Sequence, residues 1–376
     1  MLKILVEGWR DLNQSYSLVN QWQLLELKKY TNSLYHRDSP NFSNWNKLNN
    51  SSGLEQDQMK VIQSIPQPSI NDKFDVTYRI DFPYNMAPVI SGKLFVFGTS
   101  EYQNLMDLHF KNKPQINNFN NYGSIITPSN WSRIGFENAG FLKERIYVVP
   151  HGVDPATFNA NRIEKRKKFR EALSLKENDF VLFSLGAMSE NKGIDLLLEA
   201  FAVLKEKHKN LKLILKDQSK LYNILGKDLL NQASQKISTK YLTQNFYDSI
   251  RLISDNLSLQ QIHGLYCASD LYVSPYRAEG FNLPPLEAAA SGTTILVTKN
   301  GSTDDYFNDC LGLRIESDIC YSNDQVYLSP HLESLIISID SIVSDNKFNS
   351  LVQSKYVHDR FSWHKVTKQL ATILGL

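Results

Sequence analysis

Hydrophobic and polar positions alternate in blocks along the whole chain. In its first part, short apolar runs rich in β-branched and aromatic residues predict strands; they cover residues 3–6, 33–36, 74–80, 93–98, 124–127 and 146–150. A helix is predicted from about residue 18 to residue 30. Residues 38–72 are rich in Asn, Ser, Gln and Asp and predict a long polar connection. Strands that alternate with helices favour βαβ units and a parallel sheet.

The same pattern restarts once, near residues 155–180. Further strands are predicted at residues 180–186, 211–216, 250–254, 270–274 and 293–298. After the first of these, apolar residues recur on one face of a predicted helix; they are Ile194, Leu197, Leu198, Phe201 and Leu204. The sequence therefore predicts an α/β protein with two doubly wound, Rossmann-like domains that face each other across a cleft.

Composition narrows the class of protein. The chain has 376 residues, a formal net charge of +2, 42% hydrophobic residues and 21% charged residues. The small net charge does not favour nucleic-acid binding, and we find no apolar run of about 18 residues that predicts a spanning helix. Cys267, Cys310 and Cys320 form no metal-ligand pattern. The first residues read directly as a strand, with an apolar run too short for a signal peptide, so we expect a cytoplasmic protein.

Ligands of such sheets bind at the carboxyl ends of the strands. That rule selects four stretches: Glu7–Tyr16, Ala187–Gly193, the segment after Lys216, and the loop that contains Glu279.

The last of these stretches combines two carboxylates with a helix start. Pro284 suits the first turn of a helix, and Gly292 suits its end. The helix N-terminus predicts an anion site. Glu287, about one turn inside, could accept hydrogen bonds from the vicinal hydroxyls of a ribose, and Glu279 would face a second hydroxylated group. The alternative is that both glutamates are exposed caps of an ordinary strand-to-helix turn.

The run Glu-Gly-Phe-Asn-Leu-Pro-Pro-Leu-Glu, residues 279–287, resembles the donor loop of the retaining glycosyltransferases of family four, the group 1 transferases with a GT-B fold. Residues 129–154, 185–204 and 361–370 resemble further segments of that family in the same order. The resemblance implies an N-terminal acceptor domain over residues 1–155. It also implies a nucleotide-sugar domain over residues 156–360 and a C-terminal helix, about 361–376, that packs back on the first domain.

The resemblance also implies roles for single residues. Glu287 would hold the ribose, Glu279 would contact the transferred sugar, and Lys192 beside Gly193 would neutralise the leaving diphosphate. Backbone amides would cradle the diphosphate and the sugar; they map to Gly280, Phe281, Asn282 and Leu283. This chemistry requires neither a metal nor a cofactor.

Two departures from the family pattern stand out. The arginine that usually precedes the lysine by five residues is replaced by Ala187. Lys216, at a neighbouring strand end, either substitutes for it or is a solvated lysine. The histidine common after an N-domain strand is missing from residues 95–102, where Thr99, Ser100 or Glu101 would occupy its space.

Other candidates carry open alternatives. In the first loop, Trp9, Arg10, Asn13 and Gln14 could touch donor or acceptor, or Trp9 could simply pack the loop. His109 is expected at the surface or in the core, and His151 in a hinge contact.

Two charged segments are also ambiguous. The basic run 162–170 could touch an anionic membrane or a lipid-linked acceptor, but a solvated helix face is favoured. Asp304 and Asp305 could suggest a metal, but we favour the view that they cap and polarise a helix N-terminus.

Together these observations favour a metal-independent, retaining transfer of a hexose-like sugar from a nucleoside diphosphate to a carbohydrate, lipid-linked or protein acceptor. Synthesis of a glycan or surface polysaccharide is the expected context, in the cytoplasm or at the inner face of the membrane. The alternatives are a non-catalytic binder of sugar nucleotides, or a GT-B phosphorylase or epimerase.

Overall fold

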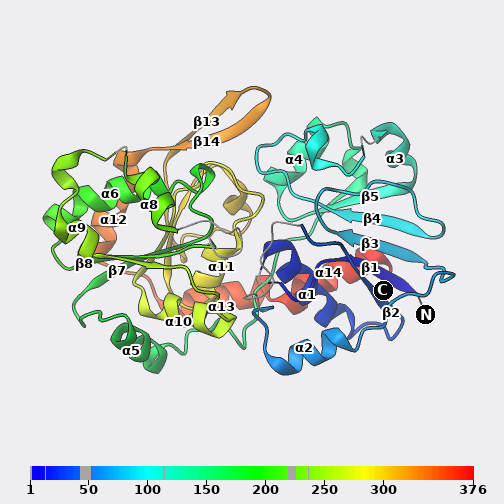
Figure 1. Ribbon diagram of the computed structural model, residues 1–376, viewed down its shortest axis with the longest axis horizontal. Coiled ribbons are helices and arrows are strands. Elements are labelled where there is room, and N and C mark those ends of the chain that lie inside the picture. The colour runs from blue at the N-terminus through cyan, green and yellow to red at the C-terminus, as the bar shows by residue number, and fades with distance from the viewer. Residues whose placement is uncertain (1, 13, 43–51, 113–114, 219–225, 236) are drawn as a thin grey trace. The chain divides into compact units, whose positions relative to one another are not determined.

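The computed structural model describes the chain except residues 1, 13, 43–51, 113–114, 219–225 and 236. The chain forms two compact units, which we call unit 1 (Met1–Gly152, Asn323–Val326 and Phe361–Leu376) and unit 2 (Val153–Ser322 and Tyr327–Arg360). Each unit is built on a six-stranded parallel sheet with helices on both faces (Figure 1). The predicted α/β class with two doubly wound sheets is confirmed.

Unit 1 contains a sheet with the order β2-β1-β3-β4-β5-β6. Its strands are β1 (Ile4–Gly8), β2 (Leu34–Asp38), β3 (Val76–Ile80), β4 (Lys93–Phe97), β5 (Gly123–Thr127) and β6 (Ile146–Val148). All six lie where the apolar runs predicted them. The direction in which strands are added reverses between β1 and β3.

The helices of unit 1 divide between the two faces of this sheet. They are α1 (Ser15–Leu27), α2 (Gln56–Gln63), α3 (Ile116–Tyr122), α4 (Asn130–Asn138) and α14 (Trp363–Leu374), with short 3₁₀ turns at Asp107–His109 and Lys143–Arg145. Figure 1 shows α3 and α4 on one face and α1 and α14 on the other. The first face packs an aromatic core around Phe119, Phe136 and Phe141.

Two local predictions for unit 1 differ from the structure. Helix α1 begins at Ser15 rather than near residue 18, because the Gln14 side chain accepts a hydrogen bond from the Ser17 amide and caps the helix. The predicted polar connection 38–72 contains α2, which buries Ile62 completely on its inner face. A helix with so few apolar residues gives little periodic signal. Residues 43–51 of the connection lie outside the described residues.

The C-terminal helix α14 belongs to unit 1 and packs against α1. The rings of Trp363 and Trp22 stack with centroids 6.2 Å apart and planes 8° from parallel. The Gln369 side chain donates to the Val148 carbonyl at 2.9 Å. These contacts join the last helix of the chain to elements from its first half.

Unit 2 contains a sheet with the order β12-β11-β10-β7-β8-β9. Its strands are β7 (Phe180–Leu185), β8 (Leu211–Lys216), β9 (Ile250–Ile253), β10 (Leu271–Ser274), β11 (Thr294–Thr298) and β12 (Gly312–Ile315). A separate two-stranded sheet pairs β13 (Ser317–Ser322) with β14 (Gln325–Pro330). The apolar runs predicted β7 to β11 but not β12, β13 or β14. Exposed polar positions interrupt the pattern in β13 and β14, and β12 is only four residues long and includes Arg314.

Helices cover both faces of the unit 2 sheet. They are α5 (Ile163–Ala172), α6 (Ile194–Lys207), α8 (Gly226–Ser234), α9 (Gln244–Asp248), α10 (Leu259–Ala268), α11 (Leu283–Ala290), α12 (Leu332–Ser344) and α13 (Ser350–Phe361), with 3₁₀ turns at Glu190–Lys192, Thr239–Tyr241 and Ser302–Asp305. Figure 1 shows α6 and α12 on one side of this sheet and α10 and α5 on the other.

The α6 face of the unit 2 core confirms the predicted helical stripe. Leu197, Leu198 and Phe201 are completely buried, and they pack with Leu213 and Val273 of the sheet. Within the described ranges, none of the helices combines the length and the hydropathy that crossing a bilayer requires.

Candidate functional site

The candidate site of unit 2 lies where two neighbouring strands end. Strands β7 and β10 pair in parallel at the point where the strand order of the sheet reverses. In doubly wound sheets the ligand crevice opens at this switch point, outside the carboxyl ends of the strands. Residues 186–193 lead from β7 to α6, and residues 275–282 lead from β10 to α11. Both loops were selected by the sequence.

The two loops meet through a lysine and a glutamate. The Lys192 ammonium group forms an ion pair and hydrogen bond with Oε1 of Glu279. The Glu279 residue is only 6% exposed, so the lysine compensates a carboxylate that is largely removed from water. These residues are 87 positions apart in the sequence, and the structure brings their side chains into direct contact. Their predicted roles toward a donor stay predictions.

Gly193 allows this contact for a steric reason. Its φ angle is +68°, and a Cβ atom at this position would lie 2.0 Å from the Pro275 carbonyl oxygen. A side chain would therefore push the lysine loop away from the β10 loop. The glycine thus positions Lys192 rather than offering a side chain of its own.

Arg277 fixes the same two loops and was not singled out from the sequence. Its guanidinium forms a bidentate ion pair with Asp195, with both nitrogen–oxygen distances at 2.8 Å. It also donates to the Glu190 carbonyl at 2.7 Å, and the Arg277 amide donates to the Asn191 carbonyl at 2.7 Å. Bidentate arginine–carboxylate pairs are directional as well as strong, so Arg277 holds the lysine loop in one position.

Glu287 is buried inside helix α11. It is 7% exposed, and its Oε2 accepts a hydrogen bond from the Tyr266 hydroxyl of α10 at 3.0 Å. Burial raises the pKa of Glu287 to about 8, although the bond from Tyr266 opposes that rise. The alternative that Glu279 and Glu287 are exposed caps of a turn is wrong. Tyr266 was missed because nothing in the sequence connects an aromatic residue of α10 to a carboxylate of α11.

The N-terminus of α11 is shaped by Asn282. This residue is the N-cap and adopts the left-handed conformation, with φ 65°. Its side chain donates to the Ser274 hydroxyl at 2.9 Å, and its carbonyl accepts from the Tyr306 hydroxyl at 2.8 Å. The Phe281 ring packs against Tyr306 with centroids 5.2 Å apart. The side chains of Phe281 and Asn282 are thus buried in the protein. That the turn binds a ligand through backbone groups at Gly280, Phe281, Asn282 and Leu283 stays a prediction.

Lys216 lies at the carboxyl end of β8, next to β7. The Gly186 amide donates to the Lys216 carbonyl at 3.0 Å, and the lysine side chain donates to the Asp217 carbonyl. Lys216 is 7% exposed, so the alternative of a solvated strand-end lysine is wrong. That it substitutes for the arginine missing at Ala187 stays a prediction.

The candidates in the first loop of unit 1 make structural contacts. Trp9 is buried and its indole donates to the Pro40 carbonyl at 2.9 Å, which favours the packing alternative. Arg10 forms an ion pair with Asp38 of β2 at 2.8 Å. Gln14 caps α1, as described above. Asn13 lies outside the described residues.

The segment after β4 was predicted to replace a missing histidine. The Thr99 hydroxyl lies 3.0 Å from the Tyr16 hydroxyl, in a buried cluster that also includes Tyr84. Ser100 is buried and donates to the Asn104 carbonyl. Glu101 is exposed, and its carbonyl accepts from the Trp131 indole at 2.7 Å. Of the three, Glu101 has the most accessible side chain.

Two histidines of unit 1, His109 and His151, were expected to have structural positions. His151 is buried among aromatic rings, with Phe97 at 5.7 Å and Trp363 at 6.2 Å between centroids. Burial lowers its pKa to about 3, which keeps the imidazole neutral. His109 is half-buried, and its Nδ1 lies 2.9 Å from the Met106 amide.

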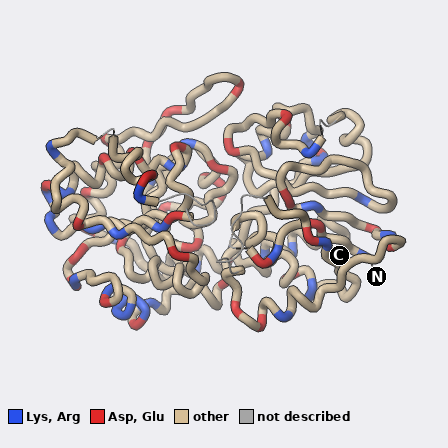
Figure 2. Tube along the Cα trace, in the orientation of Figure 1, with Lys and Arg blue, Asp and Glu red and all other residues tan. Residues whose placement is uncertain are grey.

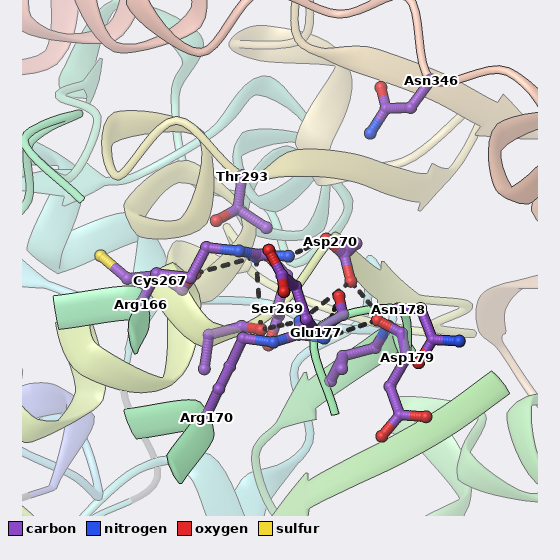
Figure 3. A network of polar contacts seen from close by, with 12 residues as sticks. Arg166, Arg170, Glu177, Asn178, Asp179, Cys267, Ser269, Asp270, Thr293 and Asn346 are labelled. Atoms are coloured by element: carbon purple, nitrogen blue, oxygen red, sulfur yellow. Dashed lines mark hydrogen bonds and ion pairs between the residues drawn. The ribbon is translucent and has the colours of Figure 1, made fainter. Parts of the chain in front are cut away.

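Residues 163–170 of the basic run lie in α5, and Arg162 is its N-cap; Figure 2 shows the Lys and Arg positions along this helix. Arg162, Arg166 and Arg170 donate to backbone carbonyls near the C-terminus of α10; the acceptors include Cys267, Ala268 and Ser269. Figure 3 shows Arg166 and Arg170 converging on the Asp270 carboxylate, with ion-pair distances of 2.5 Å and 3.4 Å. The prediction of a solvated helix face is wrong for these arginines, because cations satisfy the unpaired carbonyls of a helix end.

The same arginines line a cavity of about 750 Å³ beside Asp270 and Thr294. These residues precede β10 and begin β11, so the cavity lies at the amino ends of the strands. Ligands of parallel sheets bind at the opposite edge, and the guanidinium groups are already engaged by carbonyls and Asp270. The cavity is therefore not the candidate site.

Asp304 and Asp305 lie in a short 3₁₀ turn. The N-cap of this turn is Gly301, and Asp304 instead forms an ion pair with Arg314 of β12. The predicted capping role is thus wrong for Asp304, but both aspartates lie in the first turn, where carboxylates polarise a helix N-terminus as predicted. Among the described residues, no group of three or more His, Cys, Asp or Glu side chains is arranged to hold a metal ion.

Comparisons with known proteins agree with the resemblance stated from the sequence. Residues 165–316 match the family model described as "Glycosyl transferases group 1". The recognition of that family is therefore confirmed over this part of unit 2.

Two curated relatives illustrate the similarity. A mannosylfructose-phosphate synthase of Agrobacterium fabrum is 28% identical over 165 residues, which are 44% of this chain and 35% of that protein. A lipopolysaccharide 1,2-N-acetylglucosaminetransferase of Salmonella typhimurium is 24% identical over 272 residues, which are 70% of this chain and 65% of that protein. The match thus spans between about a third and two thirds of these relatives.

Solved structures resemble the chain over its whole length. Anabaena HepE in complex with UDP and glucose superposes with a TM-score of 0.70 at 17% identity, covering 100% of both chains. A glycosyltransferase from Rickettsia africae superposes with a TM-score of 0.69 at 14% identity, covering 99% of this chain and 98% of that one. The chain has the GT-B fold that the sequence predicted.

Proposed function

We propose that this protein, with its GT-B fold and its group 1 glycosyltransferase segment, transfers a hexose-like sugar from a nucleoside-diphosphate sugar to an acceptor. The observation that carries the proposal is the arrangement at the switch point of unit 2. There, the Lys192–Glu279 ion pair joins the two loops beside the N-terminus of α11, and the same helix carries the buried Glu287.

The donor would be bound by complementary groups along these elements. Vicinal ribose hydroxyls would donate to the Glu287 carboxylate. The diphosphate would meet the N-terminal end of α11, where the helix dipole favours anions, together with the Lys192 ammonium group. Glu279 would accept a hydrogen bond from a hydroxyl of the transferred sugar. We assign Lys216 an auxiliary part in charge compensation, since Ala187 supplies none.

The chemistry follows from charge development on the leaving group. Cleavage of the bond between the anomeric carbon and the diphosphate oxygen places negative charge on the nucleoside diphosphate. The Lys192 ammonium group and a helix dipole would stabilise that charge. These protein groups would supply the compensation that a metal ion would otherwise give, so we propose a metal-independent, cofactor-independent transfer. We also propose retention of configuration, which rests on the resemblance to the group 1 family alone.

The ligands and names of similar proteins support a nucleotide-sugar donor but do not identify the acceptor. HepE was solved with UDP and glucose, and the Salmonella relative is named as an N-acetylglucosaminetransferase of lipopolysaccharide. We propose that unit 1 binds the acceptor, a carbohydrate, lipid-linked or protein molecule, in glycan or surface polysaccharide synthesis in the cytoplasm. For a lipid-linked acceptor at the inner face of the membrane, Lys167 and Lys168 are the exposed lysines of the basic run.

The proposal is tested by donor hydrolysis followed with proton NMR. The protein is incubated in turn with UDP-, GDP-, ADP- and dTDP-sugars, with Glu279→Gln as control. We expect slow release of sugar from one donor class, first as the anomer with the configuration of the donor, and at least tenfold slower release by the variant.

Three other outcomes would change the proposal. Release at the same rate by Glu279→Gln would remove this residue from the reaction. Tight binding of a donor without release, with any acceptor tried, would favour a non-catalytic sugar-nucleotide binder, a candidate supported by Ala187. Release of a sugar phosphate in the presence of inorganic phosphate would instead indicate a phosphorylase.

A further inference from the structure

Lys192 has two roles that compete for one positive charge. In the structure its ammonium group is engaged by the Glu279 carboxylate. In the proposed function the same ammonium group neutralises the donor's diphosphate. A lysine carries one compact charge, so stronger pairing with one anion weakens its attraction for the other.

Glu279 also has two competing partners, Lys192 and the transferred sugar. Its carboxylate is 6% exposed and is compensated by Lys192. A buried carboxylate that loses its cation is costly unless another donor replaces it. A hydroxyl of the transferred sugar is such a donor. Departure of Lys192 and arrival of the sugar would therefore compensate each other.

The surroundings restrict the movement to a side chain. Arg277 holds the lysine loop through Asp195 and through the Glu190 carbonyl, and Gly193 lies against Pro275. The flexible four-carbon stem of the lysine can still swing. Lys192 can therefore change partner while its backbone stays in place.

We propose that the donor's diphosphate takes Lys192 from Glu279, and that this exchange frees the Glu279 carboxylate to bind the transferred sugar. The proposal rests on the proposed function and deepens it. Glu279 and the diphosphate then compete for Lys192. A nucleoside diphosphate without a sugar must break the Lys192–Glu279 ion pair to bind, and it has no sugar hydroxyl that could bind the Glu279 carboxylate in return.

A simpler effect has to be separated from this exchange. The Glu279 carboxylate could repel the diphosphate directly through space, with no part for Lys192. Both ideas predict that Glu279→Gln binds a nucleoside diphosphate more tightly. They differ in a Lys192→Met background: direct repulsion persists there, whereas competition for Lys192 disappears.

The test is a double-mutant cycle measured by calorimetry. UDP, GDP, ADP and dTDP are titrated into the wild type, Glu279→Gln, Lys192→Met and the double variant. For the diphosphate that binds, we expect Glu279→Gln to tighten binding by about threefold to tenfold and Lys192→Met to weaken it by about tenfold or more. The double variant should match Lys192→Met within about twofold.

A matched control removes an acid from the same loop. Glu190 is exposed and precedes Lys192 by two positions, so Glu190→Gln should leave the affinity within about twofold. Thermal melting of every variant tests whether it is folded. The double variant removes both charges of the ion pair, so it leaves neither partner unpaired.

Each remaining outcome has a clear meaning. An affinity of Glu279→Gln equal to or weaker than the wild type overturns the exchange. So does an equal gain from Glu279→Gln in the wild-type and Lys192→Met backgrounds, which would indicate direct repulsion. If none of the four diphosphates binds any of these proteins, the proposed function itself fails and the exchange fails with it.

Discussion

Burial changes the chemistry of Glu287, the residue proposed to bind the ribose of the donor. Its carboxyl group lies inside α11, where burial raises its pKa to about 8. At neutral pH a large fraction is therefore protonated. Ribose hydroxyls that donate to the carboxylate favour the ionised form, so nucleotide binding should lower this pKa and release a proton.

This proton release gives a residue-scale prediction. At pH 7, binding of a nucleoside diphosphate should release a proton from the wild type but not from Glu287→Gln. Affinity for the wild type should rise with pH up to about 8. Calorimetry in two buffers of different ionisation enthalpy measures the number of protons released by each protein. Protons from the ligand's own phosphate are released with both proteins, so they cancel when the two numbers are subtracted. Equal proton release by both proteins would contradict the assignment.

At the residue scale, the sequence predicted the residues proposed to contact the donor, but it did not predict the residues that position them. The motif around Glu279 and Glu287 and the lysine–glycine pair could be recognised locally. Tyr266 and Arg277 could not, because their roles come from contacts with Glu287 and Asp195, which lie 21 and 82 positions away. Such partners become visible only when the elements are packed.

The loop between β7 and α6 is the element on which the proposed site depends. If Arg277 holds it in place, Arg277→Ala should lower the donor hydrolysis rate by about tenfold to a hundredfold, because displacement of a reacting group by about 1 Å has effects of this size. Arg277→Lys should recover only part of the rate, since lysine cannot form the bidentate pair. Kinetics with the donor found above provides the measurement.

A second substitution makes this test specific. Asp195→Asn should cause a similar loss, and Arg277→Ala should cost little more in that background. If the two losses simply multiply, the ion pair is not the means by which the loop is positioned.

Helix α5 tests the corrected interpretation of the basic run. Arg166 donates to carbonyls near the end of α10 and pairs with Asp270, so Arg166→Ala should lower the free energy of unfolding of unit 2 by about 1–3 kcal/mol. Lys168 on the same helix is exposed, and Lys168→Ala should change it by less than about 0.5 kcal/mol. Urea denaturation compares the two. Equal stability of both variants would restore the solvated-face interpretation.

Among the elements, long apolar strands were predicted and weakly patterned ones were not. Strand β7, for example, is largely buried and reads as a nearly continuous hydrophobic run. Helix α2 lies in a polar segment and anchors itself mainly through Ile62. The arginines of α5 were misjudged because charge alone does not show whether a helix end lies nearby to accept their hydrogen bonds.

Three histidines, spread over both units, are buried in the neutral form. Burial lowers the pKa of His36 and His263 to about 4 and that of His151 to about 3. In the unfolded chain they titrate near 6.5. The unfolded state therefore binds more protons as the pH falls from about 6.5 toward 4, and stability is lost over that range.

Glu287 acts with the opposite sign, since its raised pKa stabilises the folded state as the pH falls from about 8 toward 4.5. Each of the three histidines changes the free energy of unfolding by up to about 1.4 kcal/mol per pH unit. Their combined effect on the pH dependence should therefore exceed that of the single Glu287. We expect the urea midpoint to be lower at pH 5 than at pH 7, and His151→Phe to reduce the difference. A midpoint that is unchanged or higher at pH 5 would contradict this assignment.

The central claim is that unit 2 binds a nucleoside diphosphate through Glu287, and binding measures it more directly than turnover, which can depend on the acceptor. We would titrate UDP, GDP, ADP and dTDP into the wild type and Glu287→Ala by calorimetry, with melting curves to show that the variant is folded. The account predicts that one diphosphate binds the wild type and binds the folded variant at least about tenfold more weakly. Equal affinity for both proteins, or no binding of any diphosphate to the wild type, would contradict it.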